Sequence, residues 1–140
     1  MQFELFYENE CWKFETEHLI DPDTRQLFQD LITKNEISWT DKDIEYFLET
    51  KGTLHTCKIT KTLSEKYIPT DTTDAFACSF PAEVKKVIIC IYSSNALSTI
   101  DVDRIMQNIT NPLPNETIIL WGWIIEEEYC DNYTVKIIFI

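Results

Sequence analysis

Two apolar segments near the end of the chain decide the fold: residues 118–125 read IILWGWII, and residues 133–140 read YTVKIIFI. Both are rich in β-branched and aromatic residues, a composition typical of β-strands. Acidic residues at 126–128 and the pair Asp131-Asn132 lie between them. The pattern therefore predicts two strands joined as a hairpin by an acidic turn.

The alternation within the first segment predicts that both faces of this strand are covered. Trp121 and Trp123 lie two residues apart and share one face, whereas Ile118, Leu120 and Ile124 lie on the other. Apolar side chains on both faces are typical of a strand inside the core. We therefore expect the two tryptophans to be core residues.

Three more regions show strand patterns. Residues 87–92, VIICIY, form a continuous apolar run suited to a strand buried on both faces, and residues 53–60 are rich in β-branched side chains. At the N-terminus, residues 3–7 and 12–16 alternate with a period close to two around the polar stretch 8–10. This arrangement predicts an N-terminal β-hairpin.

Capping signals predict the helices between the strands. Thr40, followed three residues later by Asp43, forms a capping box, and Gly52 lies where a left-handed C-cap would end that helix. Similar caps precede two other segments with apolar residues at helical spacing. The expected helices cover residues 22–34, 41–51, the segment through Val102, Ile105 and Met106, and a short stretch near 72–80.

Length and charge narrow the class of protein. The 140 residues suit a single α+β domain, built on a four-stranded mixed sheet flanked by helices, with the N-terminal hairpin at residues 1–20 as an extension. The net charge of −12 repels phosphates, so we expect neither nucleic acid nor a membrane as a partner. Gly52 and Gly122 are the only glycines, which excludes a glycine-rich nucleotide loop.

Other patterns predict a cytoplasmic protein without a cofactor. The N-terminus shows no signal-peptide pattern, and no apolar run approaches the ~20 residues that span a bilayer. Five cysteines, an odd number without C-x-x-C spacing, are expected to be reduced. His18 and His55 have no second ligand at metal-binding spacing, so we assign no metal site.

Three segments carry a resemblance to a known family. Residues 37–44 read ISWTDKDI and precede Lys51-Gly52, which is similar to the N-x-D-F-A-D-V loop and the later K-G of FtsZ, the bacterial tubulin-like cell-division GTPase. Residues 91–94, IYSS, lie where that family has I-T-G-G, and residues 119–125 resemble its I-I-F-G-A-V-I strand. The resemblance covers about residues 27–140 and implies the two-layer sandwich of the FtsZ C-terminal domain.

The departures from the family bear on function. The GTPase domain with its G-G-G-T-G-T-G signature has no counterpart here, which implies that the chain does not bind GTP as FtsZ does. In the family loop, an asparagine and an aspartate reach the nucleotide of the neighbouring subunit, and Ser38 and Thr40 stand at those positions. Only the last acid is kept, as Asp43, and an acid at a helix start more commonly serves as a cap.

The resemblance also leaves one surface to explain. In the family, the helices lie mainly on one side of the sheet, and the GTPase domain shelters the central helix. We expect the added hairpin, with Phe3, Phe6, Trp12 and Phe14, or else a partner subunit, to cover the corresponding surface here.

These inferences lead to two hypotheses about function. The first is a non-catalytic interaction domain that associates with itself or with a tubulin/FtsZ-like GTPase, as a filament cap or regulator. The alternative is a small oligomeric enzyme or ligand-binding protein with a site between subunits, because fold analogy alone does not decide function. No nucleophile–base pair has recognisable spacing, so we assign no catalytic residue. The residues of the expected partner interface are Ser38, Trp39, Thr40, Asp41 and Asp43.

Overall fold

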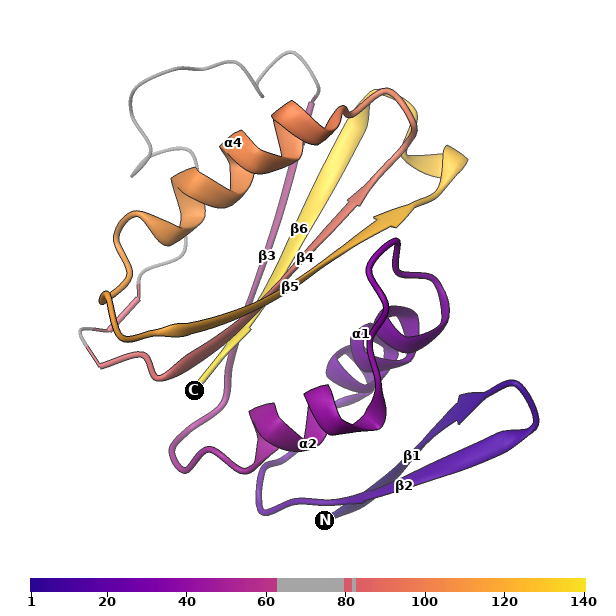
Figure 1. Ribbon diagram of the computed structural model, residues 1–140, viewed down its shortest axis with the longest axis vertical. Helices are drawn as coiled ribbons and strands as arrows, with labels where there is room; N and C mark the ends of the chain where they lie inside the picture. The colour runs from indigo at the N-terminus through magenta and orange to yellow at the C-terminus, as the bar shows by residue number, and fades with distance from the viewer. Residues whose placement is uncertain (63–79, 82) are drawn as a thin grey trace.

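The computed structural model describes residues 1–62, 80–81 and 83–140, and it is built around a four-stranded mixed sheet (Figure 1). β4 pairs in parallel with β5 and antiparallel with β6, and β6 pairs antiparallel with β3. The order is β3-β6-β4-β5, so the α+β class is confirmed, whereas the short helix expected near 72–80 falls almost wholly outside the described residues. The strands are β3 (His55–Thr62), β4 (Lys86–Ser93), β5 (Ile118–Ile125) and β6 (Asn132–Phe139).

The two strands that decide the fold do not form a hairpin, so that prediction is wrong. β4 lies between β5 and β6, and the 3-10 helix η2 (Glu127–Tyr129) is part of the connection that passes around its end. β4 is buried along its whole length, and its backbone groups need a neighbouring strand on each side. The apolar run 87–92 therefore takes a central position, and β5 is left at an edge of the sheet.

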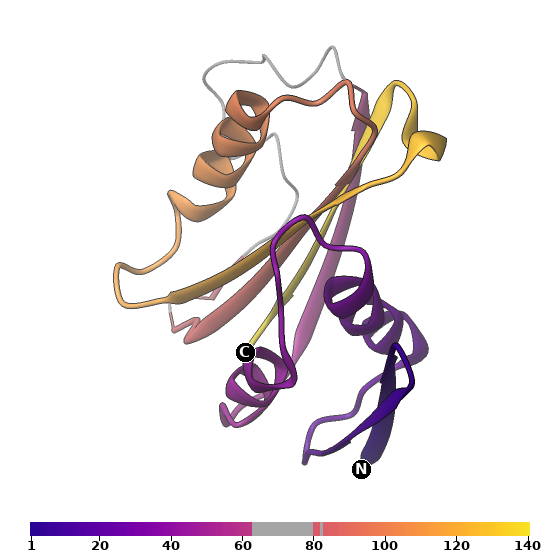
Figure 2. The same cartoon turned by 45° about the vertical axis from the view of Figure 1, so that its right-hand side comes forward.

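Helices cover both faces of the sheet, as two views show (Figures 1 and 2). α1 (Pro22–Thr33) and α2 (Asp41–Leu48) lie on one face of the sheet. α4 (Thr99–Thr110) lies on the other face and belongs to the connection that leads from β4 to β5. Each face has its own apolar core. The α1–α2 layer therefore comes in addition to the two-layer sandwich that the resemblance implies.

Each of these helices begins at the cap that the sequence predicts. Asp21 Oδ1 accepts a hydrogen bond from the backbone N–H of Thr24 at 2.7 Å, and capping boxes begin α2 and α4. The end of α2 differs from the prediction: the helix stops at Leu48, and Gly52 lies beyond it with a φ of +135°. Gly52 is therefore not the C-cap of α2.

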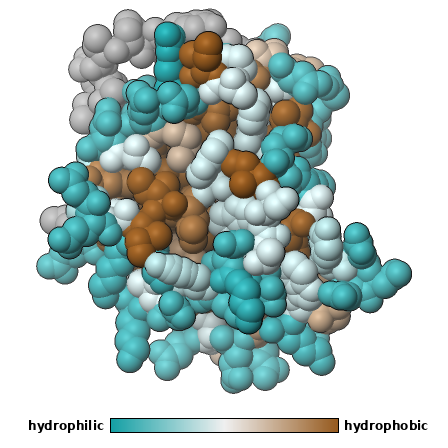
Figure 3. Space-filling view, viewed as in Figure 1, coloured by the Kyte–Doolittle hydropathy of each residue, from teal (hydrophilic) through white to brown (hydrophobic). Residues whose placement is uncertain are grey.

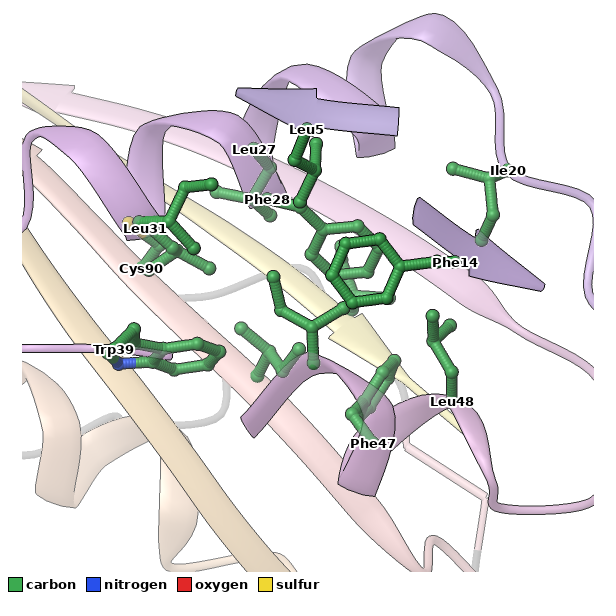
Figure 4. Close-up of a cluster of buried hydrophobic side chains, with 14 of the residues drawn as sticks. Leu5, Phe14, Ile20, Leu27, Phe28, Leu31, Trp39, Phe47, Leu48 and Cys90 are labelled. Atoms are coloured by element: carbon green, nitrogen blue, oxygen red, sulfur yellow. The ribbon is translucent and has the colours of Figure 1, made fainter. Parts of the chain in front are cut away.

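The N-terminal hairpin packs on α1 rather than on the sheet. β1 (Gln2–Tyr7) and β2 (Glu10–Glu15) pair antiparallel. The ring of Phe3 stacks on Phe14 with centroids 5.0 Å apart and lies 6.0 Å from the ring of Phe28 on α1. In Figure 4, Phe14 from the hairpin and Phe28 from α1 meet in the same cluster. The hairpin thus shelters the outer side of the helix that covers the sheet.

The four aromatic residues expected in this cover have different environments. Phe3 and Phe14 are buried. Trp12 is half-buried and tilts against Tyr7 at 5.4 Å between centroids, whereas Phe6 is 52% exposed. The prediction is therefore confirmed for Phe3 and Phe14, and it is wrong for Phe6.

Among the cysteines that the structure describes, one differs from the expectation that all are reduced. Cys11, Cys90 and Cys130 are free, but Cys57 is disulfide-bonded. Disulfides persist mainly in oxidising compartments, so the bond at Cys57 does not support the expected cytoplasmic location. That location stays a prediction. Within the described part of the chain, no helix combines the length and apolarity needed to cross a bilayer.

Candidate interaction site

The segment 34–40, which we call the edge loop, joins α1 to α2 along the outer edge of β5. Asn35 forms an antiparallel bridge with Ile124, and its Oδ1 accepts the backbone N–H of Trp123 at 2.9 Å. The backbone N–H of Glu36 donates to the carbonyl of Trp123 at 2.8 Å. The loop therefore occupies backbone groups that an edge strand would otherwise leave open.

Trp39 anchors the far end of the edge loop. Its Nε1 donates to the backbone carbonyl of Trp121 at 2.9 Å, and its side chain is 9% exposed. Figure 4 shows its ring among the apolar side chains between the helices and the sheet. Trp39 was predicted as an interface residue, but it serves chiefly to hold the loop on β5.

Thr40 and Asp43 are also engaged within the chain. Asp43 Oδ2 accepts the backbone N–H of Thr40 at 2.8 Å and lies 3.4 Å from the Thr40 hydroxyl. Both residues thus serve the start of α2. Ser38 is exposed, and Asp41 is half-exposed with Oδ1 accepting the backbone N–H of Lys42 at 3.0 Å. Of the five predicted interface residues, Ser38 and Asp41 are the ones best placed to meet a partner.

Asn35 and Gly122 organise the loop, and the sequence analysis did not select either of them for this role. Asn35 Oδ1 also accepts the backbone N–H of Ile37 at 3.0 Å. A Cβ added at Gly122 would lie 2.5 Å from Leu31 Cδ2 and 2.6 Å from Asn35 Nδ2, closer than carbon and nitrogen atoms pack. The one available signal was a glycine in the interior of an apolar strand, which often marks a close approach.

A buried polar cluster behind the edge loop fixes α1 on the sheet. The Tyr92 hydroxyl donates to Asp30 Oδ2 at 2.8 Å, and Gln26 Nε2 donates to Asp30 Oδ1 at 2.9 Å. Lys34 Nζ lies 3.9 Å from Asp30 Oδ1 and 3.5 Å from Glu126 Oε1. Burial, more than the nearby charges, raises the pKa of Tyr92, so its hydroxyl stays protonated and remains a donor.

The described residues show no arrangement typical of catalysis. Within the described ranges, no group of three or more His, Cys, Asp and Glu side chains is placed as metal ligands would be. The buried hydroxyls of Ser93 and Ser94 are engaged, the first accepting from Trp123 Nε1 at 2.8 Å and the second donating to the Cys130 carbonyl at 2.9 Å.

No family model matches the sequence, and no curated protein is significantly similar to it. Solved structures do match: an empty FtsZ dimer from M. jannaschii has a TM-score of 0.64 and 16% identity, and a mutant FtsZ from M. jannaschii has a TM-score of 0.64 and 13% identity. This chain has an FtsZ-like fold. The matches cover 80% and 82% of the chain.

The FtsZ-like chain spans about a third of the length of those structures, 34% and 36% respectively. This share is consistent with a fragment that resembles the C-terminal domain, the resemblance inferred from residues 27–140. At such low identity the likeness establishes the fold and leaves the activity to be argued from the site.

Proposed function

We propose that this FtsZ-like chain is a non-catalytic protein-interaction domain that docks on a tubulin/FtsZ-like GTPase and regulates its filament. The observation that supports this function is the rigid attachment of the edge loop. Hydrogen bonds at Asn35, Glu36 and Trp39 hold it on β5 and leave Ser38 outside. A loop already held in one conformation loses little freedom when it binds, which favours association.

The chemistry of the loop supports an inhibitory effect on the partner. In the resembled family, an amide and a carboxylate at this place reach the nucleotide of the next subunit. Here Ser38 offers a hydroxyl, and Thr40 is bonded to Asp43 within the start of α2. The loop would therefore still fit the end of a filament by its shape. It would lack the amide and the carboxylate that orient the attacking water in the resembled family. Among residues 1–62, 80–81 and 83–140, no specific contact favours the enzyme or ligand-binding alternative.

Mixing the protein with an FtsZ, and following GTP turnover together with light scattering, tests this function. We expect less polymer and slower turnover at substoichiometric protein. The substitutions Ser38→Arg and Asp41→Lys should relieve the inhibition, because each places bulk or opposite charge at the contact. Asp103→Lys on α4 is the control, since it makes the same charge change at an exposed residue on the other face of the sheet.

Asp43 is not a suitable probe, because its substitution would also break the capping box of α2. Unchanged turnover and scattering at equimolar protein would contradict the proposed function. Inhibition that Ser38→Arg and Asp41→Lys leave intact would keep a regulatory role and reject the edge loop as the contact.

A further inference from the structure

The first half of β5 is an apolar sheet edge that the edge loop reaches only at the Trp121 carbonyl. Ile118 and Ile119 are each 39% exposed and Trp121 is 36% exposed. Figure 3 shows apolar residues gathered over this part of the strand. The expectation that packing covers both faces of the strand is therefore wrong for its first half. β5 carries no charged residue, whereas the opposite edge strand, β3, carries Lys58 and Lys61.

Backbone groups on β5 point alternately toward β4 and toward the open edge. The N–H of Ile118 donates inward to the carbonyl of Lys85 at 2.9 Å, so even-numbered residues face the sheet. Odd-numbered residues face outward, and the edge loop engages both groups of Trp123 and the carbonyl of Trp121. At the start of the strand, the N–H of Thr117 donates to the Pro114 carbonyl at 3.0 Å.

Between Thr117 and Trp121, four outward groups have no assigned hydrogen bond in the part of the chain that the structure describes. They are the carbonyl of Thr117, the N–H and carbonyl of Ile119, and the N–H of Trp121. Peptide groups at an exposed edge are a template for another strand. Their order along the chain is important. The free carbonyl acceptor of Thr117 lies two residues before Ile119, the free N–H donor of Trp121 lies two residues after it, and Ile119 has one free group of each kind.

This order is self-complementary. If a second copy of β5 runs antiparallel with Ile119 opposite Ile119, these two residues exchange both of their backbone hydrogen bonds. The N–H of Trp121 in each copy then meets the carbonyl of Thr117 in the other. The two groups already engaged, the Thr117 N–H and the Trp121 carbonyl, face each other and need no further partner.

We propose that two copies of this chain associate through β5 in this register, with a two-fold axis at Ile119. The side chains agree with it, since Ile118 of one copy lies opposite Leu120 of the other, and Ile119 meets its own counterpart. Pairing stops where the edge loop begins and where the turn from Pro114 to Thr117 leaves the edge. The result is one sheet of eight strands shared by the two copies.

The interface is small, and each copy carries a net charge of −12. We therefore expect a weak dimer in the micromolar range that tightens as salt screens the repulsion. This proposal does not rest on docking to a GTPase, because Ser38 and Asp41 lie outside the pairing.

Sedimentation of the full chain over a range of protein and salt concentrations tests the pairing. Ile119→Lys and Ile119→Glu should each weaken association by about tenfold or more, since like charges would lie directly opposite. An equimolar mixture of the two variants should associate again, because the lysine then faces the glutamate. Thr56→Lys adds the same charge to the opposite edge strand, at an exposed residue, and should leave association at the wild-type level.

A second variant tests the backbone directly. Ile119→Pro removes an outward N–H and leaves the inward bonds to β4 in place, which an edge strand tolerates. It should abolish association while thermal unfolding remains cooperative. A wild-type protein that stays monomeric at high protein and salt concentration would overturn the proposal. A mixture of the lysine and glutamate variants that associates no better than either alone would also overturn it.

Discussion

The hydroxyl of Tyr92 and the carboxylate of Asp30 form a 2.8 Å hydrogen bond in which both residues are buried. A carboxylate is tolerated inside a protein only where hydrogen bonds and charges replace its water. Gln26 supplies a second donor, and Lys34 lies at the edge of the cluster. Any rotation of α1 on the sheet would break these bonds, so this contact specifies how the helix sits.

Tyr92→Phe should destabilise the protein by about 1–3 kcal/mol, because it leaves one oxygen of Asp30 buried without its donor. The free energy of unfolding in urea measures the effect. Tyr129→Phe is the matched control: no hydrogen bond is assigned to that hydroxyl in the described region, and we expect a change within about 0.5 kcal/mol. Equal losses in both variants would mean that Asp30 does not depend on Tyr92.

The same tyrosines predict a loss of stability in alkali. Burial is the main cause that raises the pKa of Tyr92 above its usual 10.0, and burial together with Glu126 and Glu128 raises the pKa of Tyr129 to about 12. The folded protein therefore holds these protons more tightly than the unfolded chain. Their contribution is complete below pH 10 and decreases as the pH rises through the folded-state pKa values.

Urea unfolding followed from about pH 8 to about pH 11 measures this dependence. We expect the free energy of unfolding to fall above about pH 10, by up to about 1.4 kcal/mol per pH unit for each such group. Tyr92→Phe should reduce the slope, and Tyr129 should account for part of what remains. A slope above pH 10 that is the same in wild type and Tyr92→Phe would contradict the assignment to Tyr92.

Between elements, α1 and the edge loop approach β5 closely at Gly122. Gly122→Ala should destabilise the protein by about 1–3 kcal/mol, because the new methyl group would overlap Leu31 and Asn35. Thermal or urea unfolding measures the loss. Leu31→Ala removes the Leu31 part of this overlap, so the losses of the two single variants should sum to more than the loss of the double variant. Strict additivity would show that the contact is not close.

Helix starts could be predicted from sequence because their signals are local. Asp21, Thr40 and Ser98 each lie within three residues of the backbone groups that they cap. Strand order is not local: β5 and β6 follow each other in sequence, yet β4 lies between them. The order depends on which strand can be buried on both sides, and no short pattern encodes that competition.

The position of the candidate site in the chain could be predicted from sequence, but the side-chain contacts within it could not. The pattern around Ser38 located the loop, but the sequence alone did not show that Trp39 turns inward to the Trp121 carbonyl. The role of Asn35 is not predictable from sequence, because a single asparagine between two helices has many possible roles. The exposed half of β5 was missed for a related reason, since alternating apolar residues look the same whether or not another element covers them.

At the scale of the whole molecule, acidic charge sits where a phosphate would otherwise bind. The N-termini of the three α-helices in the described residues are closed by the carboxylates of Asp21, Asp43 and Asp101. Each occupies the positive end of a helix dipole, the site that commonly attracts an anion. The net charge of −12 adds a long-range repulsion to these local ones.

We expect the protein neither to bind nor to hydrolyse GTP. Beyond its capped helices, it has two glycines, and the one at Gly122 is pressed against Leu31 and Asn35 and cannot approach a ligand. Calorimetric titration with GTP and magnesium should give no binding heat under conditions in which an FtsZ does. Micromolar affinity would contradict the expectation and would favour a ligand-binding role. If no heat is found, any GTP turnover in a mixture with FtsZ belongs to the partner, and changes in turnover measure regulation by this chain.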